Sequence, residues 1–191
     1  MKTWLNKRFE IYQNLIMNDD LNSLIIQMRN MVIETRERGG KMIFAGNGAS
    51  NTIATHASLD FMNQLGIPCL PLNDSSVITA FSNDFGYDSC VERFTKLHAN
   101  ENDMLVLISS SGMSENIVRA AKYANGVGCG IVTFTGFSSN NYLKTLGDVN
   151  FWVDSNEYNI VENIHMMWLI SVCDLIAFEE KEIIGTHGRN L

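Results

Sequence analysis

The feature that most constrains the fold of this chain is an alternation of short apolar runs with segments of helical pattern. The apolar runs are residues 42–45, 67–72, 104–108, 130–134 and 149–153. Helices are predicted between them, at about 51–64, 75–82, 89–98, 114–125 and 140–146, and a long last helix at about 158–180. Short continuous apolar strands separated by helices are typical of a parallel sheet with helices on both faces. The sequence therefore predicts an α/β fold of three layers with a parallel central sheet.

The chain before the first apolar run is predicted to be helical. Apolar side chains recur there at spacings of three and four residues and form one stripe: Leu21, Leu24, Ile25, Met28, Met31 and Val32. An isolated domain has little reason to expose such a stripe, so we expect residues 1–38 to serve oligomerisation. Residues 39–180 would form the α/β core and 181–191 a tail. The length of 191 residues suits one domain.

Charge and composition exclude several classes of function. The formal net charge of -7 argues against nonspecific nucleic-acid binding, which requires a basic surface. A phosphorylated small molecule remains compatible, because a helix N-terminus binds phosphate without basic side chains. The four cysteines form no C-x-x-C pair and are expected to be reduced. No secretory signal is recognised at the N-terminus, so we expect a cytoplasmic protein.

One long apolar run, residues 164–178, raises the question of a membrane span. It contains His165 and Asp174 and is shorter than the roughly 20 residues that a bilayer requires. We therefore predict a buried helix, and no membrane partner.

Two loops follow predicted strands and lead directly into predicted helices. The first, residues 44–50, reads FAGNGAS, and the second, residues 108–116, reads ISSSGMSEN. Ligands of open parallel sheets lie beyond the carboxyl ends of the strands, which is where these loops stand. Small residues let the backbone approach a phosphate, and the helix N-terminus supplies free N–H groups. The alternative is that each loop is a tight turn with a serine N-cap. Anion binding is favoured for the serine loop, and both interpretations stay open for the first loop.

Neither loop has the pattern of a nucleotide site. The Gly-Lys-[Ser/Thr] ending of a phosphate-binding P-loop is missing, and so is the third glycine of the dinucleotide fingerprint. We therefore expect no nucleotide cofactor.

The two loops resemble those of the SIS (sugar isomerase) domain family, and within it the chain resembles the phosphoheptose isomerases. The matching segments are GNGAS at 46–50, THASLDF at 55–61, ITAFSNDFGYD at 78–88, LISSSGMSENI at 107–117, TFTG at 133–136 and NIVENIH at 159–165. The resemblance implies interconversion of sedoheptulose 7-phosphate and D-glycero-D-manno-heptose 7-phosphate through an enediol, in the synthesis of heptose or surface-polysaccharide precursors. It also implies a homotetramer with sites between subunits.

The resemblance assigns roles to residues of both loops and of the segment that follows. The serines implied to hold the phosphate are Ser109, Ser110, Ser111 and Ser114. The residues implied to line the sugar site are Asn47, Gly48, Ala49, Ser50, Asn83 and Asp84.

The catalytic positions depart from the family pattern. The family has a histidine followed four residues later by a glutamate, and this chain has His56 and Asp60. On the last helix the family has a glutamine and, eight residues on, a histidine, whereas this chain has Glu162 and Ile170. The family's metal site, usually zinc, therefore loses one imidazole and could gain a carboxylate.

Aldose–ketose isomerisation needs a base, and an acid or a Lewis acid that polarises the carbonyl. A divalent metal held by His56, Asp60 and Glu162 would have three protein ligands and an open position. The base would be Asp60, if it is not a ligand, or Glu162. His165 shares a helix face with Glu162 but does not replace the missing imidazole directly, since positions 165 and 170 lie about 140° apart on a helix.

Other interpretations of these residues stay open. His56 and His165 could be core histidines, and Asp60 a structural partner of a helix cap. The chain could be a SIS protein of different chemistry, or a catalytically silent phosphosugar-binding or protein-binding regulator.

Overall fold

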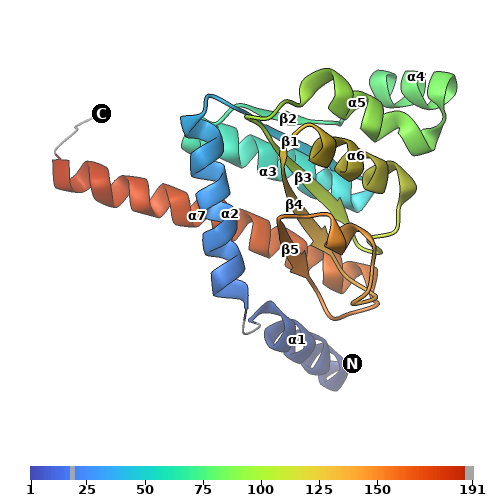
Figure 1. Ribbon diagram of the computed structural model, residues 1–191. Coiled ribbons are helices and arrows are strands. Elements are labelled where there is room, and N and C mark those ends of the chain that lie inside the picture. The colour runs from blue at the N-terminus through green and yellow to red at the C-terminus, as the bar shows by residue number, and fades with distance from the viewer. Residues whose placement is uncertain (18–19, 188–191) are drawn as a thin grey trace.

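The structure, a computed structural model, describes residues 1–17 and 20–187, with side chains to residue 181. Its centre is a parallel sheet of five strands in the order β2-β1-β3-β4-β5 (Figure 1). The strands are β1 Met42–Gly46, β2 Cys69–Pro71, β3 Met104–Ser109, β4 Gly130–Thr135 and β5 Val149–Trp152. The α/β fold with a parallel central sheet is thus confirmed.

Helices connect the strands and cover both faces of the sheet. They are α1 Lys2–Ile16, α2 Leu21–Glu37, α3 Ala49–Leu65, α4 Ser75–Phe85, α5 Cys90–His98, α6 Glu115–Gly126 and α7 Tyr158–His187. Two short 3-10 turns, η1 Tyr87–Ser89 and η2 Leu143–Thr145, lie in the loops. Since α7 continues to His187, most of the predicted tail is helical, and residues 188–191 lie outside the described part of the chain.

Two elements differ from their predicted lengths for local reasons. The edge strand β2 spans Cys69–Pro71 rather than 67–72, because Pro68 and Pro71 have no N–H to donate to a sheet. The helix predicted at 140–146 is wrong, and only the 3-10 turn η2 forms there. The Asn141 side chain binds the carbonyls of Gly136 and Ser138, which holds this segment in a loop instead.

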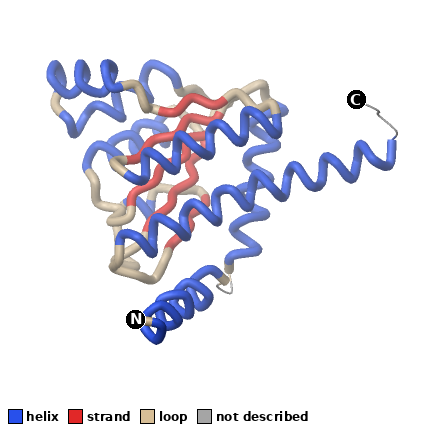
Figure 2. Tube along the Cα trace, turned by 180° about the vertical axis from the view of Figure 1, so that it is seen from behind, coloured by secondary structure: helices blue, strands red, loops and turns tan. Residues whose placement is uncertain are grey.

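Alternate residues of each strand pack against different helices. Phe44, Val106 and Phe134 face the layer formed by α2, α3 and α7, and Ile43 and Leu105 face the layer formed by α5 and α6. The two layers are visible on opposite sides of the sheet in Figures 1 and 2. All these strand side chains are fully buried, which explains why the strands read as continuous apolar runs.

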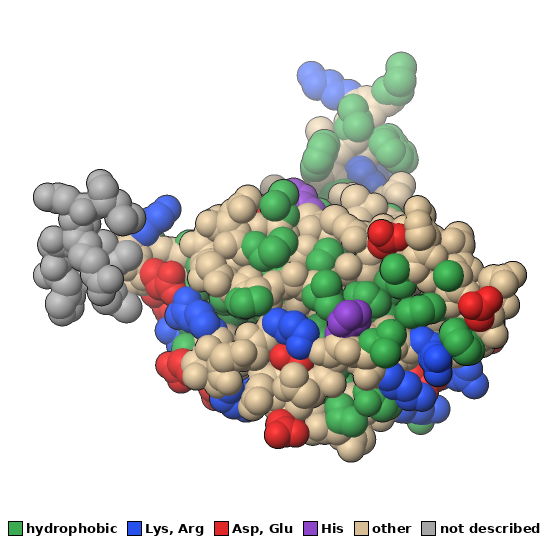
Figure 3. All heavy atoms as spheres, turned by 90° about the horizontal axis from the view of Figure 1, so that it is seen from above, with side chains coloured by type: hydrophobic (Ala, Val, Ile, Leu, Met, Phe, Trp, Pro, Cys, Tyr) green, Lys and Arg blue, Asp and Glu red, His purple; other side chains and the backbone are tan. Residues whose placement is uncertain are grey.

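The two N-terminal helices behave differently from each other. The apolar stripe on α2 packs on the sheet of its own chain, with Met28 and Val32 fully buried and Leu24, Ile25 and Met31 partly buried, so its period is explained by the core of one chain. In contrast, α1 buries no residue, and Trp4 and Phe9 are 64% and 63% exposed. This helix projects from the domain, as Figures 1 and 3 show.

The last helix, α7, contains the long apolar run. Its segment Tyr158–Lys181 is long and apolar enough to cross a membrane, but over half of its most apolar window is buried in the domain. Trp168, Val172 and Ile176 pack in the layer with α2 and α3. The prediction of a core helix at this position is therefore confirmed.

Candidate functional site

The serine loop connects the carboxyl end of β3 to α6. Gly112 lies at its apex with φ +61°, and a Cβ added there would come within 2.0 Å of Asn141 Oδ1, so the turn requires glycine. Ser114 is the N-cap residue of α6, yet its side chain makes no capping hydrogen bond. The hydroxyl of Ser110 is buried without a protein partner. These hydroxyls are therefore not used up by the turn, which favours anion binding over a serine cap.

The first loop connects β1 to α3 and also contains no serine cap. Its N-cap residue is Gly48, with φ +57° and ψ -124°, a conformation that side chains rarely allow. A Cβ at Gly46 would lie 2.7 Å from the backbone of Ser50. The turn is thus built from glycines that bring the start of α3 close to the sheet.

A pair of amide side chains joins the two loops. Asn47 Nδ2 donates to Asn116 Oδ1 at 3.0 Å, and Asn116 Nδ2 donates to Asn47 Oδ1 at 2.9 Å. The Tyr87 hydroxyl donates to the same Asn47 oxygen at 2.8 Å. Because Asn116 is only 2% exposed, this network fixes the spacing between the loops.

A small cavity of about 170 Å³ lies between the two loops and the start of α7. It is lined by Asn47, Ser50, Ile108, Ser109, Ser110, Ser111, Ser114, Tyr158 and Glu162. The structure thus brings the four predicted phosphate serines together with two residues of the first loop and one predicted catalytic carboxylate. Tyr158 was missed by sequence reasoning. The available signal was its spacing of four from Glu162, which puts both on one helix face.

Glu162 is the carboxyl group that lines this cavity. Partial burial raises the pKa of its carboxyl above the ordinary value. A carboxylate with a raised pKa is a stronger base, and a carboxyl group at a small polar cavity can exchange a proton with a bound ligand.

The other predicted catalytic residues, His56 and Asp60, lie elsewhere on α3. His56 Nε2 is 3.2 Å from Asp60 Oδ2, which confirms that they share a helix face. The His56 side chain is 54% exposed and lines a separate cavity of about 670 Å³. Burial, and then the nearby Asp60 carboxylate, raise the pKa of Cys173 to about 12. The Asp60 carboxylate is therefore within electrostatic reach of Cys173, which is eleven residues, or roughly 16 Å of helix, beyond Glu162.

The metal site expected from these residues is not assembled within one chain. Among the residues that the structure describes, no three His, Cys, Asp or Glu side chains come together in a way that could hold a metal ion. The prediction that His56, Asp60 and Glu162 converge is therefore wrong for a single chain. The physical reason is their placement on two helices, with Glu162 in the first turns of α7 at one cavity and His56 on α3 at another.

His165 has a structural role. It is fully buried, Nε2 lies 2.9 Å from the carbonyl oxygen of Thr135, and Nδ1 has no protein partner. Burial lowers the pKa of the imidazole to about 4, so the ring is neutral at physiological pH. The interpretation of His165 as a core histidine fits this geometry, and a backbone carbonyl rather than a carboxylate is its partner.

The remaining predicted residues lie outside the cavity. Gly48 and Ala49 form the turn and the first residue of α3 without lining it. Asn83 and Asp84 lie in the last turn of α4, where Asn83 Nδ2 donates to Asp84 Oδ1 at 2.9 Å. No residue of α4 is buried, and neither Asn83 nor Asp84 lines the cavity of its own chain.

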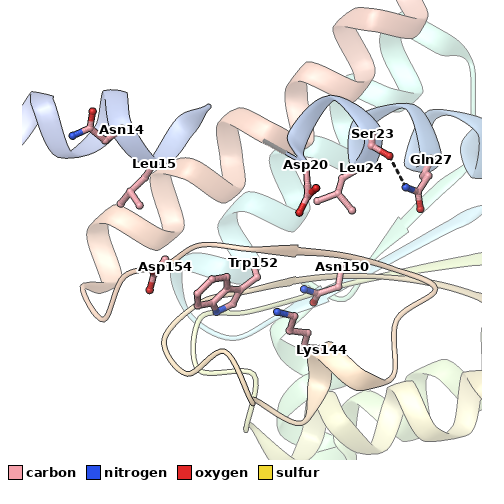
Figure 4. Close-up of a pocket in the computed structure, with 10 residues that line it drawn as sticks. All are labelled: Asn14, Leu15, Asp20, Ser23, Leu24, Gln27, Lys144, Asn150, Trp152 and Asp154. Atoms are coloured by element: carbon pink, nitrogen blue, oxygen red, sulfur yellow. Dashed lines mark hydrogen bonds between the residues drawn. The ribbon is translucent and has the colours of Figure 1, made fainter. Parts of the chain in front are cut away.

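A further cavity of about 410 Å³ lies between α2, the end of α1 and the edge strand β5 (Figure 4). The Lys144 ammonium lies 4.7 Å from the centre of the Trp152 ring, and Asp154 and Asp20 line the same space. It includes none of the predicted site residues and neither glycine-containing loop. The serine loop and Glu162 therefore define the candidate site.

Comparison with known proteins gives consistent results. The SIS domain family matches residues 7–136 of this chain. The chain is similar to a phosphoheptose isomerase of Sulfurimonas denitrificans, with 31% identity over 97% of this chain and 96% of that protein. It is also similar to a phosphoheptose isomerase of Aliarcobacter butzleri, with 29% identity over 94% of this chain and 98% of that protein. The structure of a phosphoheptose isomerase from Neisseria gonorrhoeae has the same fold, with a TM-score of 0.84 and 23% identity over 92% of this chain and 96% of that one.

Proposed function

Since this chain belongs to the SIS domain family, where its relatives are phosphoheptose isomerases, we propose that it is a phosphosugar aldose–ketose isomerase acting on a heptose 7-phosphate. The observation that carries this proposal is the cavity that Glu162 shares with the serine loop. One end of this cavity offers donors for a phosphate and the other a carboxylate for proton transfer. A phosphorylated sugar needs both in the same place.

The phosphate end works without basic residues. The side chains that line the cavity include no lysine or arginine, and the chain carries a net charge of -7. Serine hydroxyls and the N-terminal end of α6 supply neutral donors and a favourable dipole for a dianion. In this proposal Ser109, Ser110, Ser111 and Ser114 bind the phosphate, and Asn47 and Ser50 contact the sugar.

The reacting end is assigned to Glu162. Its carboxylate would take the proton from the carbon next to the substrate carbonyl and return it to the neighbouring carbon. The family resemblance implies a divalent metal, usually zinc, but the residues of one chain do not assemble its ligand set. The proposed mechanism therefore contains no metal-dependent step.

We place the working site in a homotetramer. The exposed apolar side chains of α1 and a groove of about 920 Å³ between α1 and α7 support an interface there. His56, Asp60, Asn83 and Asp84 lie outside the cavity of their own chain, and in the proposed assembly they contribute from a neighbouring subunit. The proposed location is the cytoplasm, which suits four free cysteines.

A second candidate is a phosphosugar-binding protein without isomerase activity. Ile170, in place of the family's histidine, and the unassembled metal ligand set favour it. The phosphate end would be identical in this case, so binding alone does not separate the two functions.

Turnover separates the two functions. The purified protein is incubated with a panel of phosphosugars that includes sedoheptulose 7-phosphate, and NMR follows ketose–aldose conversion together with deuterium uptake from solvent. We expect both conversion and uptake with a heptose 7-phosphate. Binding of the panel by calorimetry, without conversion of any member, would refute the isomerase and favour the silent binding protein.

A further inference from the structure

Proton transfer next to a carbonyl requires a second group besides the base. Negative charge develops on the carbonyl oxygen as the carbon loses its proton, and a hydrogen-bond donor or a cation must stabilise it. The metal ligand set is not assembled within this chain. Within one chain, the side chains that share the cavity with Glu162 are the nearest candidates for this donor.

Most of the other polar side chains that line the cavity already have hydrogen-bond partners or another role in the proposed function. The Asn47 amide is held by Asn116 and Tyr87. In the proposed function Ser109, Ser110, Ser111 and Ser114 bind the phosphate, and Ser50 contacts the sugar. Tyr158 is different, because it stands on the same wall as Glu162 and carries a hydroxyl donor.

Tyr158 and Glu162 are positioned as a pair by α7. They are four residues apart, so they lie on one face of the helix and about 6 Å apart along its axis. A carbonyl oxygen and the hydrogen on the adjacent carbon of one substrate can meet two groups at this spacing. Tyr158 is also the first residue of α7, where the helix dipole favours negative charge on a nearby oxygen.

The ring of Tyr158, a residue that is 60% exposed, packs against an unusual neighbour. Phe137 meets it edge-on, with ring centroids 4.9 Å apart and an interplanar angle of 74°. Phe137 has φ +54° and is the one non-glycine residue with positive φ in the described part of the chain. Strained backbone of this kind concentrates at functional sites.

The segment carrying Phe137 also ties α7 to the serine loop. The Gly136 N–H donates to the Ser110 carbonyl at 2.9 Å, and a Cβ at Gly136 would come within 2.7 Å of Val161. The residues after β4 therefore set the distance between the start of α7, which carries Tyr158, and the loop that carries Ser110.

From these contacts we infer that Tyr158 is a catalytic residue whose phenol donates to the substrate carbonyl oxygen while Glu162 moves the carbon-bound proton. The inference rests on the proposed isomerase function. Glu162 removes the proton from the carbon adjacent to the carbonyl, and the C=O electron pair moves to oxygen. That oxygen takes the phenol proton, which gives the enediol. The phenolate then takes the proton of the other enediol hydroxyl, and Glu162 returns its proton to the former carbonyl carbon. Both side chains are regenerated, and no oxidant or reductant is needed.

The test is Tyr158→Phe in the full chain, which removes the hydroxyl and keeps the ring against Phe137. We expect kcat for the heptose 7-phosphate to fall about 100-fold or more, the range typical of general acid–base groups. KM and calorimetric affinity should stay within about threefold, and the melting temperature should not change. Tyr142→Phe is the matched control, since Tyr142 is an exposed tyrosine outside the cavity and its variant should retain wild-type kcat.

The possible outcomes distinguish failure of the proposed role of Tyr158 from failure of the proposed isomerase function. An active wild type with a fully active Tyr158→Phe variant overturns the inference and leaves the isomerase standing. A variant that loses sugar-phosphate affinity as steeply as turnover overturns the catalytic role in favour of a binding role. A wild type that converts no member of the panel overturns both.

Discussion

Replacing Gly112 by alanine should destabilise the protein through one identifiable collision. Gly112 has φ +61°, and the left-handed conformation costs an alanine about 1–2 kcal/mol. Its new Cβ would also stand 2.0 Å from Asn141 Oδ1, too close for any real contact. Asn141 is only 1% exposed, so it has no free space into which to move.

The collision costs more free energy than the backbone strain alone, because Asn141 makes hydrogen bonds that hold its loop together. Its Nδ2 donates to the Ser138 carbonyl at 2.9 Å, and its Oδ1 accepts from the Lys144 N–H at 3.0 Å. Losing these two hydrogen bonds costs about 0.5–1.5 kcal/mol each. Together with the strain, Gly112→Ala should lower the free energy of unfolding by about 2–5 kcal/mol, a large share of the roughly 5–15 kcal/mol of a typical domain.

Gly66→Ala is the matched control. Gly66 has nearly the same φ, +63°, but a Cβ there meets nothing within 4 Å. It should lose only the strain, about 1–2 kcal/mol. Urea unfolding of both variants measures the difference. In an Asn141→Ala background Gly112→Ala should cost less than in the wild type, because only the Cβ of residue 141, at 2.8 Å, then meets the new side chain. Equal losses for Gly112→Ala and Gly66→Ala would refute the assignment of the collision.

Three further predictions follow from the site and the surface. Glu162→Gln should abolish turnover yet raise stability at neutral pH. Because the pKa of Glu162 is raised in the folded state, the wild type loses stability as the pH rises above the ordinary carboxyl range. Thermal unfolding should therefore show the variant more stable than the wild type at pH 7.5 and equally stable at pH 4. If the difference in stability between variant and wild type were the same at both pH values, the desolvation of the Glu162 carboxyl would be contradicted. Ser111→Ala and Ser109→Ala should each weaken binding of sugar phosphates several-fold with little change in melting temperature, and calorimetry that finds wild-type affinity in both would remove the loop from the site. Light scattering should find a tetramer, and Phe9→Asp on the exposed face of α1 should reduce its mass; a monomeric wild type at micromolar concentration would reject the proposed assembly.

The sequence predicted the sheet and the position of the serine loop well because both depend on local patterns. Buried parallel strands are apolar at every position, so Met104–Ser109 is visible as a run. The serine loop follows that run directly, and a strand, a turn and a helix in succession determine where its hydroxyls lie. The N-terminal stripe is a contrasting case. Its period identified a helix with one apolar face, but period alone does not say whether that face meets the chain's own sheet or another subunit.

The catalytic end was harder to predict because it depends on how two helices lie against each other. Spacing placed His56 and Asp60 on one face of α3, and the 3.2 Å contact between them agrees. Spacing says nothing about which turn of α7 meets that face. Asp60 influences Cys173 electrostatically, about three turns beyond Glu162, and Glu162 lines a cavity of its own chain that Asp60 does not line.

This separation suggests how the chain can differ from its relatives at the reacting end and keep the phosphate end. The serine loop is held by β3, by the Asn47–Asn116 pair and by the Gly136 contact, and none of these depends on the side chains at 60 or 170. A change of catalytic residues therefore leaves the phosphate in place. In the proposed function the base is then on α7, because Glu162 is the only carboxylate that lines the cavity within the described residues. A base on α7 works best with a donor on the same helix, since both then move together relative to the bound phosphate.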